Sequence, residues 1–375
     1  MTNVNDKIRS IRFSRLLLPL KIAVSDAKVL TGLQLPLEKV DILFTHIMTE
    51  QGLEGIGFSY ALRVGGRAQY VHASEIAATL IGKDPSDISK IWKSLIWLGA
   101  SVGNSGIAVQ AISAIDTALW DLKAKRANLP LSKLIGSHFD SVSCYNTSGG
   151  YLQASIEEIV EKSQHSLSCG LGGVKMKVGQ PDMKKDIMRL KTLRERLGED
   201  VSIMVDANQQ WDRIDALNFC RQVDELNPEW IEEPLDAYDI DGHAALAAAI
   251  DSPIASGEML TSSALLKQYI DKNAVDVLQP DAARIGGITP YLKVADMADT
   301  AGMRVAPHFI MEIHIHLSAC YPRESWVEHF EWLEPLFNER LKIRDGRMYV
   351  PEGPGLGLTL SDQFSEWLED EIILR

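Results

Sequence analysis

Hydrophobic and polar positions alternate along roughly the first 60 residues of the chain. The alternation is clearest in residues 11–18, 40–50 and 53–60, and a turn at residues 50–52 separates the last two segments. Because successive side chains of a strand point to opposite faces, this period predicts three half-buried strands of one sheet.

The period of the pattern then lengthens. From about residue 70 to 137, apolar residues recur three and four positions apart, which predicts amphipathic helices in 70–82, 88–99 and 106–127. The run Asp84-Pro85-Ser86-Asp87 is typical of a helix start. Strands followed by helices predict an α+β domain over residues 1–140.

A third pattern, short apolar runs separated by helical stretches, starts at about residue 141. Eight such runs over about 190 residues fit one parallel barrel of the triosephosphate isomerase type. The turn-rich segment 345–375 leaves the repeat and is expected to complete the first domain, so the barrel is predicted to occupy residues 141–344. The eight predicted strands are 141–147, 172–179, 201–208, 229–234, 252–258, 275–281, 303–308 and 325–330.

Composition and charge narrow the classes of function. The 375 residues are 46% hydrophobic with a net charge of −13, which is typical of a globular protein and argues against nucleic acid as a partner. No apolar stretch approaches the roughly 20 residues of a membrane span, so no membrane partner is expected. The apolar run near the N-terminus is too short and too Pro-broken for a signal peptide, which favours a cytoplasmic location. Widely spaced cysteines predict reduced thiols at Cys144, Cys169, Cys220 and Cys320.

Three acidic residues, Asp206, Glu232 and Glu258, each follow an apolar run at equal intervals of 26 residues. A strand, a loop and a helix take about 25 to 30 residues, so the spacing predicts one carboxylate per βα unit. Strand ends meet at one mouth of a barrel, where three carboxylates repel one another unless a cation binds. Oxygen ligands suit a hard ion, so one Mg²⁺ is the predicted cofactor. Glu233 is expected to point away from Glu232, although the spacing leaves open which of the two binds the metal.

Lys175 and Lys177 lie two positions apart in the second predicted barrel strand, so their side chains share a face. Val174, Met176 and Val178 are expected to face the helices, which leaves both lysines inside the barrel. A second cation and a metal nearby favour the neutral amine of one lysine, which makes it a base. The alternative is an outward-facing, solvated pair.

Other predicted strands also end in polar residues. Asp281 and His308 close the sixth and seventh strands 27 residues apart, where the carboxylate could hold the imidazole as a base. Glu328 in the eighth strand could donate a proton or a hydrogen bond to a substrate. Asn208, two residues after Asp206, could reach the same site with its amide.

Six short motifs occur in order along the chain: V-K-M-K-V-G, V-D-A-N, W-I-E-E-P, G-E, Q-P-D-x-x-x-x-G-G and A-P-H. Together they resemble the mandelate racemase subgroup of the enolase superfamily, and the match covers nearly the whole chain. The resemblance implies a (β/α)₇β barrel capped by an α+β domain. It also implies Mg²⁺ on the three carboxylates, Lys177 as one base, and the His308–Asp281 pair as a second base on the opposite face.

A narrower set of segments includes V-S-D-A-K-V-L-T-G, S-V-G-N-S-G, C-Y-N-T-S-G-G, E-E-P-L-D-A-Y-D-I and H-L-S-A-C-Y-P. They resemble the acid-sugar dehydratases of this family that act on L-talarate and galactarate. The resemblance implies α-proton removal and loss of water to a 2-keto-3-deoxy diacid, with competing epimerisation. It also implies a homo-oligomer, with an octamer as one expected form. The implied substrate contacts are Asp26, Lys28, Arg63, Lys175, Asn208 and Glu328; Lys28 and Arg63 would bind the far carboxylate of a diacid.

Alternative functions use some of the same residues. A racemase or epimerase needs the metal and both bases but eliminates no water. The sequence H-I-H within E-I-H-I-H-L could bind zinc, but His314 and His316 are expected on a helix, where a spacing of two points them to different faces. A binding module with a structural cation would leave the lysine pair and the His–Asp pair without a purpose.

Overall fold

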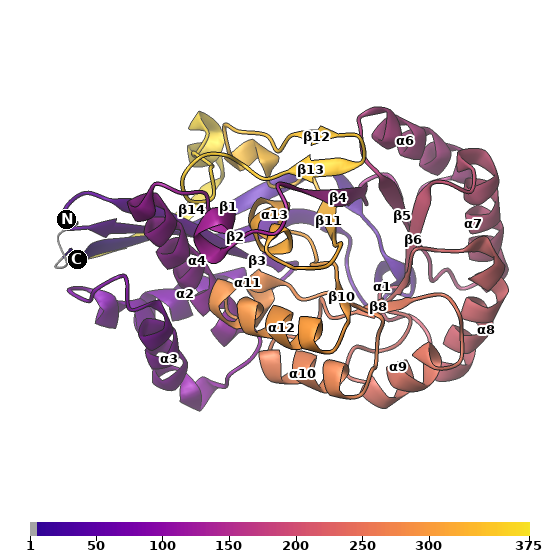
Figure 1. The fold of residues 1–375 in the computed structure, drawn as a ribbon, viewed down its shortest axis with the longest axis horizontal. Coiled ribbons are helices and arrows are strands. Elements are labelled where there is room, and N and C mark those ends of the chain that lie inside the picture. Colours follow the sequence, from indigo (N-terminus) through magenta and orange to yellow (C-terminus); the bar gives the residue numbers. More distant parts are fainter. Residues whose placement is uncertain (1–5) are drawn as a thin grey trace.

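A computed structural model describes residues 6–375. The N-terminal part contains a four-stranded antiparallel sheet in the order β14-β1-β2-β3 (Figure 1). Three of its strands correspond to the predicted segments, which are confirmed, and the fourth comes from the C-terminus. The strands are β1 (Ile8–Val24), β2 (Leu37–Thr49), β3 (Glu54–Leu62) and β14 (Leu368–Leu374).

One face of this sheet is covered by three helices, which correspond to the three predicted helical stretches: α2 (Gly66–Ala77), α3 (Ile88–Leu98) and α4 (Ile107–Ala127). Helix α4 lies directly on β3, and the absence of side chains at Gly55 and Gly57 permits this close approach. A Cβ at Gly57 would lie 2.3 Å from the carbonyl oxygen of Ala114 on α4. The other face of the sheet packs against the barrel, so the sheet is buried on both sides.

Eight parallel strands form the barrel, in the order β10-β9-β8-β7-β6-β5-β4-β11. All eight lie within the predicted runs, so this prediction is confirmed, although several strands are only two or three residues long. They are β4 (Ser141–Asn146), β5 (Gly173–Lys177), β6 (Ser202–Asp206), β7 (Ile231–Glu232), β8 (Ile254–Ser256), β9 (Val277–Leu278), β10 (Arg304–Val305) and β11 (Trp326–His329).

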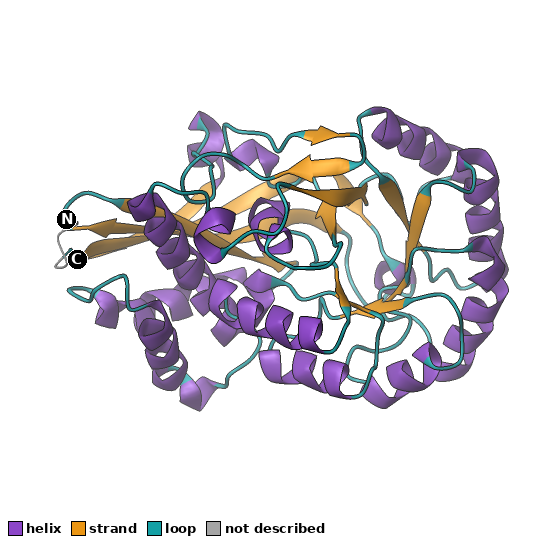
Figure 2. Ribbon diagram, in the orientation of Figure 1, coloured by secondary structure: helices purple, strands orange, loops and turns teal. Residues whose placement is uncertain are grey.

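Helices follow the first seven barrel strands and form an outer layer around them (Figure 2). No α-helix follows β11 in the described chain, which gives the (β/α)₇β arrangement. The helices of this layer are α6 (Ile156–Ser168), α7 (Met183–Leu197), α8 (Arg213–Val223), α9 (Ile240–Ala247), α10 (Ser263–Asp271), α11 (Ala282–Ile285), α12 (Ile288–Thr300) and α13 (Met311–Ala319).

The barrel core lies between the strands and the helices. Val174, Met176 and Val178 are buried in this core, as predicted, so Lys175 and Lys177 face the interior of the barrel. A separate interior cluster includes Tyr145, Met204, Trp230, Ala255, Val277 and Ala306. This apolar cluster lies next to Lys175, whose Nζ is 5.4 Å from the Tyr145 ring centre.

The C-terminal segment contributes to both parts of the molecule. Residues Arg347–Tyr349 (β13) pair antiparallel with β4 of the barrel and with β12 (Ile343–Arg344). In contrast, β14 pairs with β1, and Ile11 lies opposite Leu374. The sequence placed the boundary between the barrel and the returning C-terminal segment after residue 344. The strand pairing places β13, which lies beyond that boundary, in the barrel sheet, and the chain returns to the first sheet only at β14.

Two buried aspartates of α4 join the cap to the rest of the chain. Asp116 accepts hydrogen bonds from the backbone nitrogen and the hydroxyl of Thr289, at the start of α12. Asp121 accepts from the backbone nitrogens of Ile56 and Leu356. None of the helices within residues 6–375 is long and apolar enough to cross a membrane.

Candidate active site

A cavity of about 910 Å³ lies where the cap covers the C-terminal ends of the barrel strands. Most of the residues expected to form the site line it, and the remaining ones, Asp206, Glu232 and Asp281, are fully buried. The predicted residues in its lining are Asp26, Lys28, Arg63, Lys175, Lys177, Asn208, Glu258, His308 and Glu328. The fold therefore brings together residues from the cap and from seven strands of the barrel.

Asp206, Glu232 and Glu258 form a compact carboxylate group. Each offers one oxygen, and these three oxygens lie within 4.8 Å of one another. Burial raises the pKa of Glu232, because an ionised carboxylate loses its hydration there. Three buried oxygen donors at this separation fit a hard divalent cation such as Mg²⁺.

Lys175 and Lys177 bind these carboxylates from the neighbouring strand. The Nζ of Lys175 lies 2.7 Å from Glu232 Oε1 and 2.8 Å from Glu328 Oε1. Lys177 pairs with Asp206, which lies beside it in the β5–β6 register.

The expectation of a neutral lysine depends on a bound metal and stays a prediction. Burial by itself would lower the pKa of Lys177, but the Asp206 charge outweighs that effect and raises the pKa. A divalent cation on the same carboxylates would oppose the increase, because like charges disfavour a protonated lysine.

His308 contacts Glu258, a different member of the carboxylate group from the one that Lys177 contacts. Its Nδ1 is 3.0 Å from Asp281 Oδ2, and its Nε2 is 3.3 Å from Glu258 Oε2. Asp281 is fixed by the start of α11, because its Oδ1 accepts a 2.8 Å hydrogen bond from the Ala283 backbone nitrogen. Burial would lower the pKa of His308, but Glu258 and Asp281 raise it.

Glu328 is an ionised hydrogen-bond acceptor in this structure. Its Oε1 accepts from Thr147 and Lys175, and its Oε2 accepts a 2.8 Å hydrogen bond from the Phe309 backbone nitrogen. Burial would raise its pKa, but Lys175 and His308 lower it to about 2. These contacts indicate that Glu328 orients Lys175, and its donation of a proton or a hydrogen bond to a substrate stays a prediction.

Glu233 and Asn208 both turn toward the cavity. Each has a positive φ, 41° for Glu233 and 44° for Asn208, which interrupts the alternation of the strand. Glu233 therefore lines the cavity. The sequence had predicted only that it points away from Glu232. Its two carboxylate oxygens have no hydrogen-bond partner among the described residues. Asn208 donates its backbone N–H to Asp206 Oδ1 at 2.8 Å.

The cap contributes charged groups above the carboxylates. Arg63 donates to Asp26 at 2.8 Å and to the Leu35 carbonyl at 2.7 Å. Lys28 donates to the carbonyl of Gln209 at 2.7 Å, a neutral acceptor. Because Asp26 offsets the charge of Arg63, Lys28 is the stronger candidate to attract a second anionic group.

Sequence reasoning missed four residues that contact the site. Gln279 donates to Glu232 Oε2 at 2.8 Å, and Thr147 donates to Glu328. Tyr60 donates a hydrogen bond to Asp281, and Arg284 donates a hydrogen bond to Tyr60. Arg284 lies one helical turn after Asp281, which could have indicated it, but no local signal pairs Tyr60 with a residue 221 positions away.

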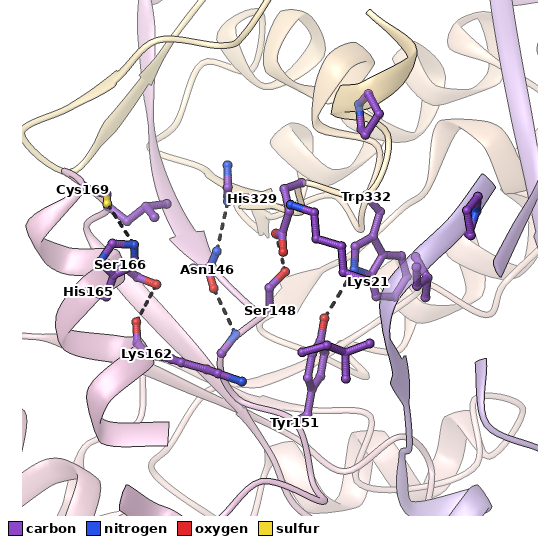
Figure 3. Close-up of a pocket in the computed structure, with 17 residues that line it drawn as sticks. Lys21, Asn146, Ser148, Tyr151, Lys162, His165, Ser166, Cys169, His329 and Trp332 are labelled. Atoms are coloured by element: carbon purple, nitrogen blue, oxygen red, sulfur yellow. Dashed lines mark hydrogen bonds between the residues drawn. The ribbon is translucent and has the colours of Figure 1, made fainter. Parts of the chain in front are cut away.

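A second cavity of about 370 Å³ shares part of its lining with the first, and Figure 3 shows the residues that line it. Tyr151 and Trp332 line both cavities and form the wall between them, with Trp332 Nε1 donating to the Tyr151 hydroxyl at 3.3 Å.

Among residues 6–375, the only group of acidic, histidine or cysteine side chains arranged to hold a metal is the carboxylate group of the larger cavity.

The histidines of the zinc alternative do not converge. Both lie on α13 and are fully buried, but they contact different elements. His314 Nε2 accepts from the Ala282 backbone nitrogen, whereas His316 Nε2 donates to the Leu356 carbonyl. This geometry excludes a shared metal between them, as the spacing predicted.

The fold and the site together define a capped (β/α)₇β barrel of the enolase type, with a carboxylate group between a lysine and a His–Asp pair. The mandelate racemase/muconate lactonizing enzyme N-terminal domain model matches residues 34–136, and the enolase C-terminal domain-like model matches residues 158–364. The chain belongs to this family, the mandelate racemase and muconate lactonizing enzymes of the enolase superfamily.

Known relatives are similar over nearly the whole chain. The L-talarate/galactarate dehydratase of Salmonella typhimurium (strain LT2) is 57% identical over 97% of this chain and 92% of its own length. Its crystal structure with Mg and L-lyxarohydroxamate has a TM-score of 0.97 and covers 98% of this chain and 94% of the other, at 56% identity. The L-talarate dehydratase structure from Polaromonas sp. JS666, complexed with Mg and L-glucarate, has a TM-score of 0.96 at 58% identity, covering 98% and 99%.

Proposed function

We propose that this chain is a Mg²⁺-dependent hydro-lyase that dehydrates L-talarate and galactarate to a 2-keto-3-deoxy diacid. The observation that carries the proposal is the position of two bases at opposite ends of one carboxylate group. Lys177 contacts Asp206, and His308 Nε2 approaches Glu258. The similarity to a dehydratase of these two diacids over nearly the full length supports the choice of substrate.

Asp206, Glu232 and Glu258 would hold the Mg²⁺. When bound, the ion supplies Lewis-acid chemistry that polarises a substrate carboxylate and makes the adjacent α-proton more acidic. The buried oxygens of the three residues, within 4.8 Å of one another, support this assignment.

The side chains around the carboxylate group would carry out the proton transfers. Lys175, oriented by Glu232 and Glu328, would stabilise the negative charge that forms on the substrate carboxylate. Lys177 or His308 would remove the α-proton, depending on the configuration of that carbon. His308 in its protonated form would then protonate the departing β-hydroxyl, which leaves as water. The resulting enol would tautomerise to the 2-keto product.

Residues of the cap would select the length of the substrate. Lys28 bonds only a neutral carbonyl here, and Arg63 is offset by Asp26, so Lys28 would bind the far carboxylate. Asp26 and Asn208 would accept or donate hydrogen bonds to the hydroxyls between the two carboxylates.

The test is a screen of hexarate and pentarate diacids with Mg²⁺, scored for 2-keto acid. We expect turnover of L-talarate and galactarate, and loss of turnover when the metal is removed. Failure to convert either diacid would contradict the proposed substrate. Deuterium uptake at the α-carbon without keto-acid formation would instead support the racemase or epimerase alternative.

A homo-oligomer in the cytoplasm completes the proposal. Light scattering coupled to size-exclusion chromatography would test the oligomer, and a monomeric mass would contradict it.

A further inference from the structure

Tyr60 brings the cap into direct contact with the His–Asp pair. It lies on β3 with 1% of its surface exposed, and its hydroxyl is 2.5 Å from Asp281 Oδ2. The same oxygen is 3.0 Å from His308 Nδ1, and the hydroxyl itself is 3.3 Å from that nitrogen. One carboxylate oxygen of Asp281 is therefore shared by a base from the barrel and a hydroxyl from the cap.

Arg284 fixes the direction of these hydrogen bonds. Its Nε donates to the Tyr60 hydroxyl at 3.0 Å, and its Nη1 donates to the Glu258 carbonyl at 3.0 Å. A guanidinium has no acceptor, so the Tyr60 oxygen accepts from Arg284 and its own proton points to Asp281. An ionised carboxylate is acceptor-only, so His308 must donate from Nδ1, which leaves Nε2 as the basic nitrogen toward the cavity.

Packing adds a second constraint on the same group. The Tyr60 ring meets the Phe309 ring edge to face, with their centres 4.8 Å apart. Phe309 follows His308 directly and has a φ of 61°, so the backbone next to the base is held in an uncommon conformation. Tyr60 thus contacts both the partner of the base and its neighbour in the chain.

We infer that Tyr60, supported by Arg284, is a positioning residue for the His308 side of the reaction. By holding Asp281, it keeps the His308 ring turned so that Nε2 faces the α-carbon, and it makes this base depend on the docked cap. Lys177 hydrogen-bonds to Asp206 and to none of these groups, so proton transfer on the opposite face does not need Tyr60. The inference rests on the proposed function, since it assigns the two bases to opposite faces of one substrate.

Tyr60→Phe removes the hydroxyl and retains the ring. The experiment measures kcat and KM for both diacids, and α-proton exchange in deuterated water for each epimer, with Mg²⁺ present. We expect kcat for the reaction in which His308 removes the α-proton to fall by roughly 10- to 100-fold, with little change in KM. A loss of this size is typical when a residue that orients a functional histidine is removed. Exchange catalysed by Lys177 should stay within about twofold of the wild type.

Tyr321→Phe is the matched control. Its hydroxyl is also buried and donates a 2.7 Å hydrogen bond to the Met303 carbonyl, away from the cavity. Both exchange rates should match the wild type in this variant.

Three outcomes overturn the inference. Undiminished exchange on both faces in Tyr60→Phe excludes a positioning role. Equal losses on both faces, with a lower Tm than Tyr321→Phe, indicate a structural role only. Absence of both α-proton exchange and keto-acid formation in the wild type overturns the inference and the proposed function together. Exchange without keto-acid formation contradicts only the dehydration reaction and still tests Tyr60.

Discussion

Lys175 carries its charge at a buried position in the cavity wall, with 2% of its surface exposed. Burial disfavours a charged amine, but Glu232 and Glu328 outweigh this effect and raise its pKa. The same balance operates at Asp206, where burial would raise the pKa and Lys177 and Lys175 lower it. At the scale of single residues, the charges of Lys175 and Asp206 are each stabilised by neighbours of opposite sign.

Replacement of either base should affect one face of the substrate. Lys177→Ala should abolish exchange of the α-proton on its side, and His308→Asn should abolish exchange on the other, because each variant lacks one proton acceptor. Exchange from the two epimers, followed by NMR in deuterated water, measures both effects. Lys184→Ala, on an exposed lysine of α7, is the control. Full activity of both variants on both epimers would contradict the assignment.

Lys28→Ala should weaken the binding of diacids. A charge-assisted hydrogen bond is worth about 1.5–3 kcal/mol, so kcat/KM for galactarate should fall by roughly 10- to 100-fold. A six-carbon acid with only one carboxylate should lose little, because it has no group for this lysine. Lys21→Ala, on an exposed lysine of the same cap, should leave both values unchanged; equal losses for the two substrates would refute the role.

At the scale of elements, the barrel strands are short, and the functional groups lie at or just beyond their ends. Asp206 and Glu232 are the last residues of β6 and β7, whereas Glu258, Asp281 and His308 follow β8, β9 and β10 by two or three residues. Periodicity identified the runs because it depends on local alternation. The last residue of each strand depends on hydrogen bonding to the neighbouring strand, and the local sequence pattern does not indicate that pairing.

Helix α13 contains a buried acid that should make stability depend on pH. Glu312 is 3% exposed, its Oε1 has no hydrogen-bond partner among the described residues, and burial raises its pKa to about 8. Since its pKa is near 4.3 in the unfolded chain, the folded state holds a proton that the unfolded state has released between these values. Stability should therefore fall as pH rises from about 4.3 to about 8.

Glu312→Gln retains the shape of the side chain without a titrating proton. At pH 8 it should increase the free energy of unfolding on the order of 2 kcal/mol, and near pH 4 it should have little effect. Urea denaturation at a series of pH values measures the difference. Glu366→Gln, on an exposed glutamate, is the control; a difference between Glu312→Gln and wild type that does not change with pH would refute the buried proton.

At the scale of the whole molecule, the net charge of −13 does not determine which ligand the cavity can bind. The cavity that would receive an anion contains Lys28, Arg63, Lys175, Lys177 and Arg284, so local cations oppose the overall field. The cap and the barrel must stay docked for this arrangement to exist, because two of these five residues come from the cap.

Mg²⁺ should stabilise the folded molecule as a whole. A ligand at 100 times its Kd adds about 2.7 kcal/mol, so Tm should rise by a few degrees with Mg²⁺ and not with NaCl of equal ionic strength. Glu258→Gln removes one ligand charge and should lose most of the increase. Thermal unfolding followed by circular dichroism measures it; an identical increase in the variant would place the ion elsewhere.

The strands, most of the helices and the order of functional groups along the barrel could be predicted from the sequence alone. Those features depend on periodicity and spacing, which neighbouring residues fix. Three features became visible only in the folded molecule: the position of Glu233 in the cavity wall, the pairing of Arg63 with Asp26 and the contact of Tyr60 with Asp281. These depend on backbone φ values and on residues as far as 221 positions apart, which meet only when the cap closes over the barrel.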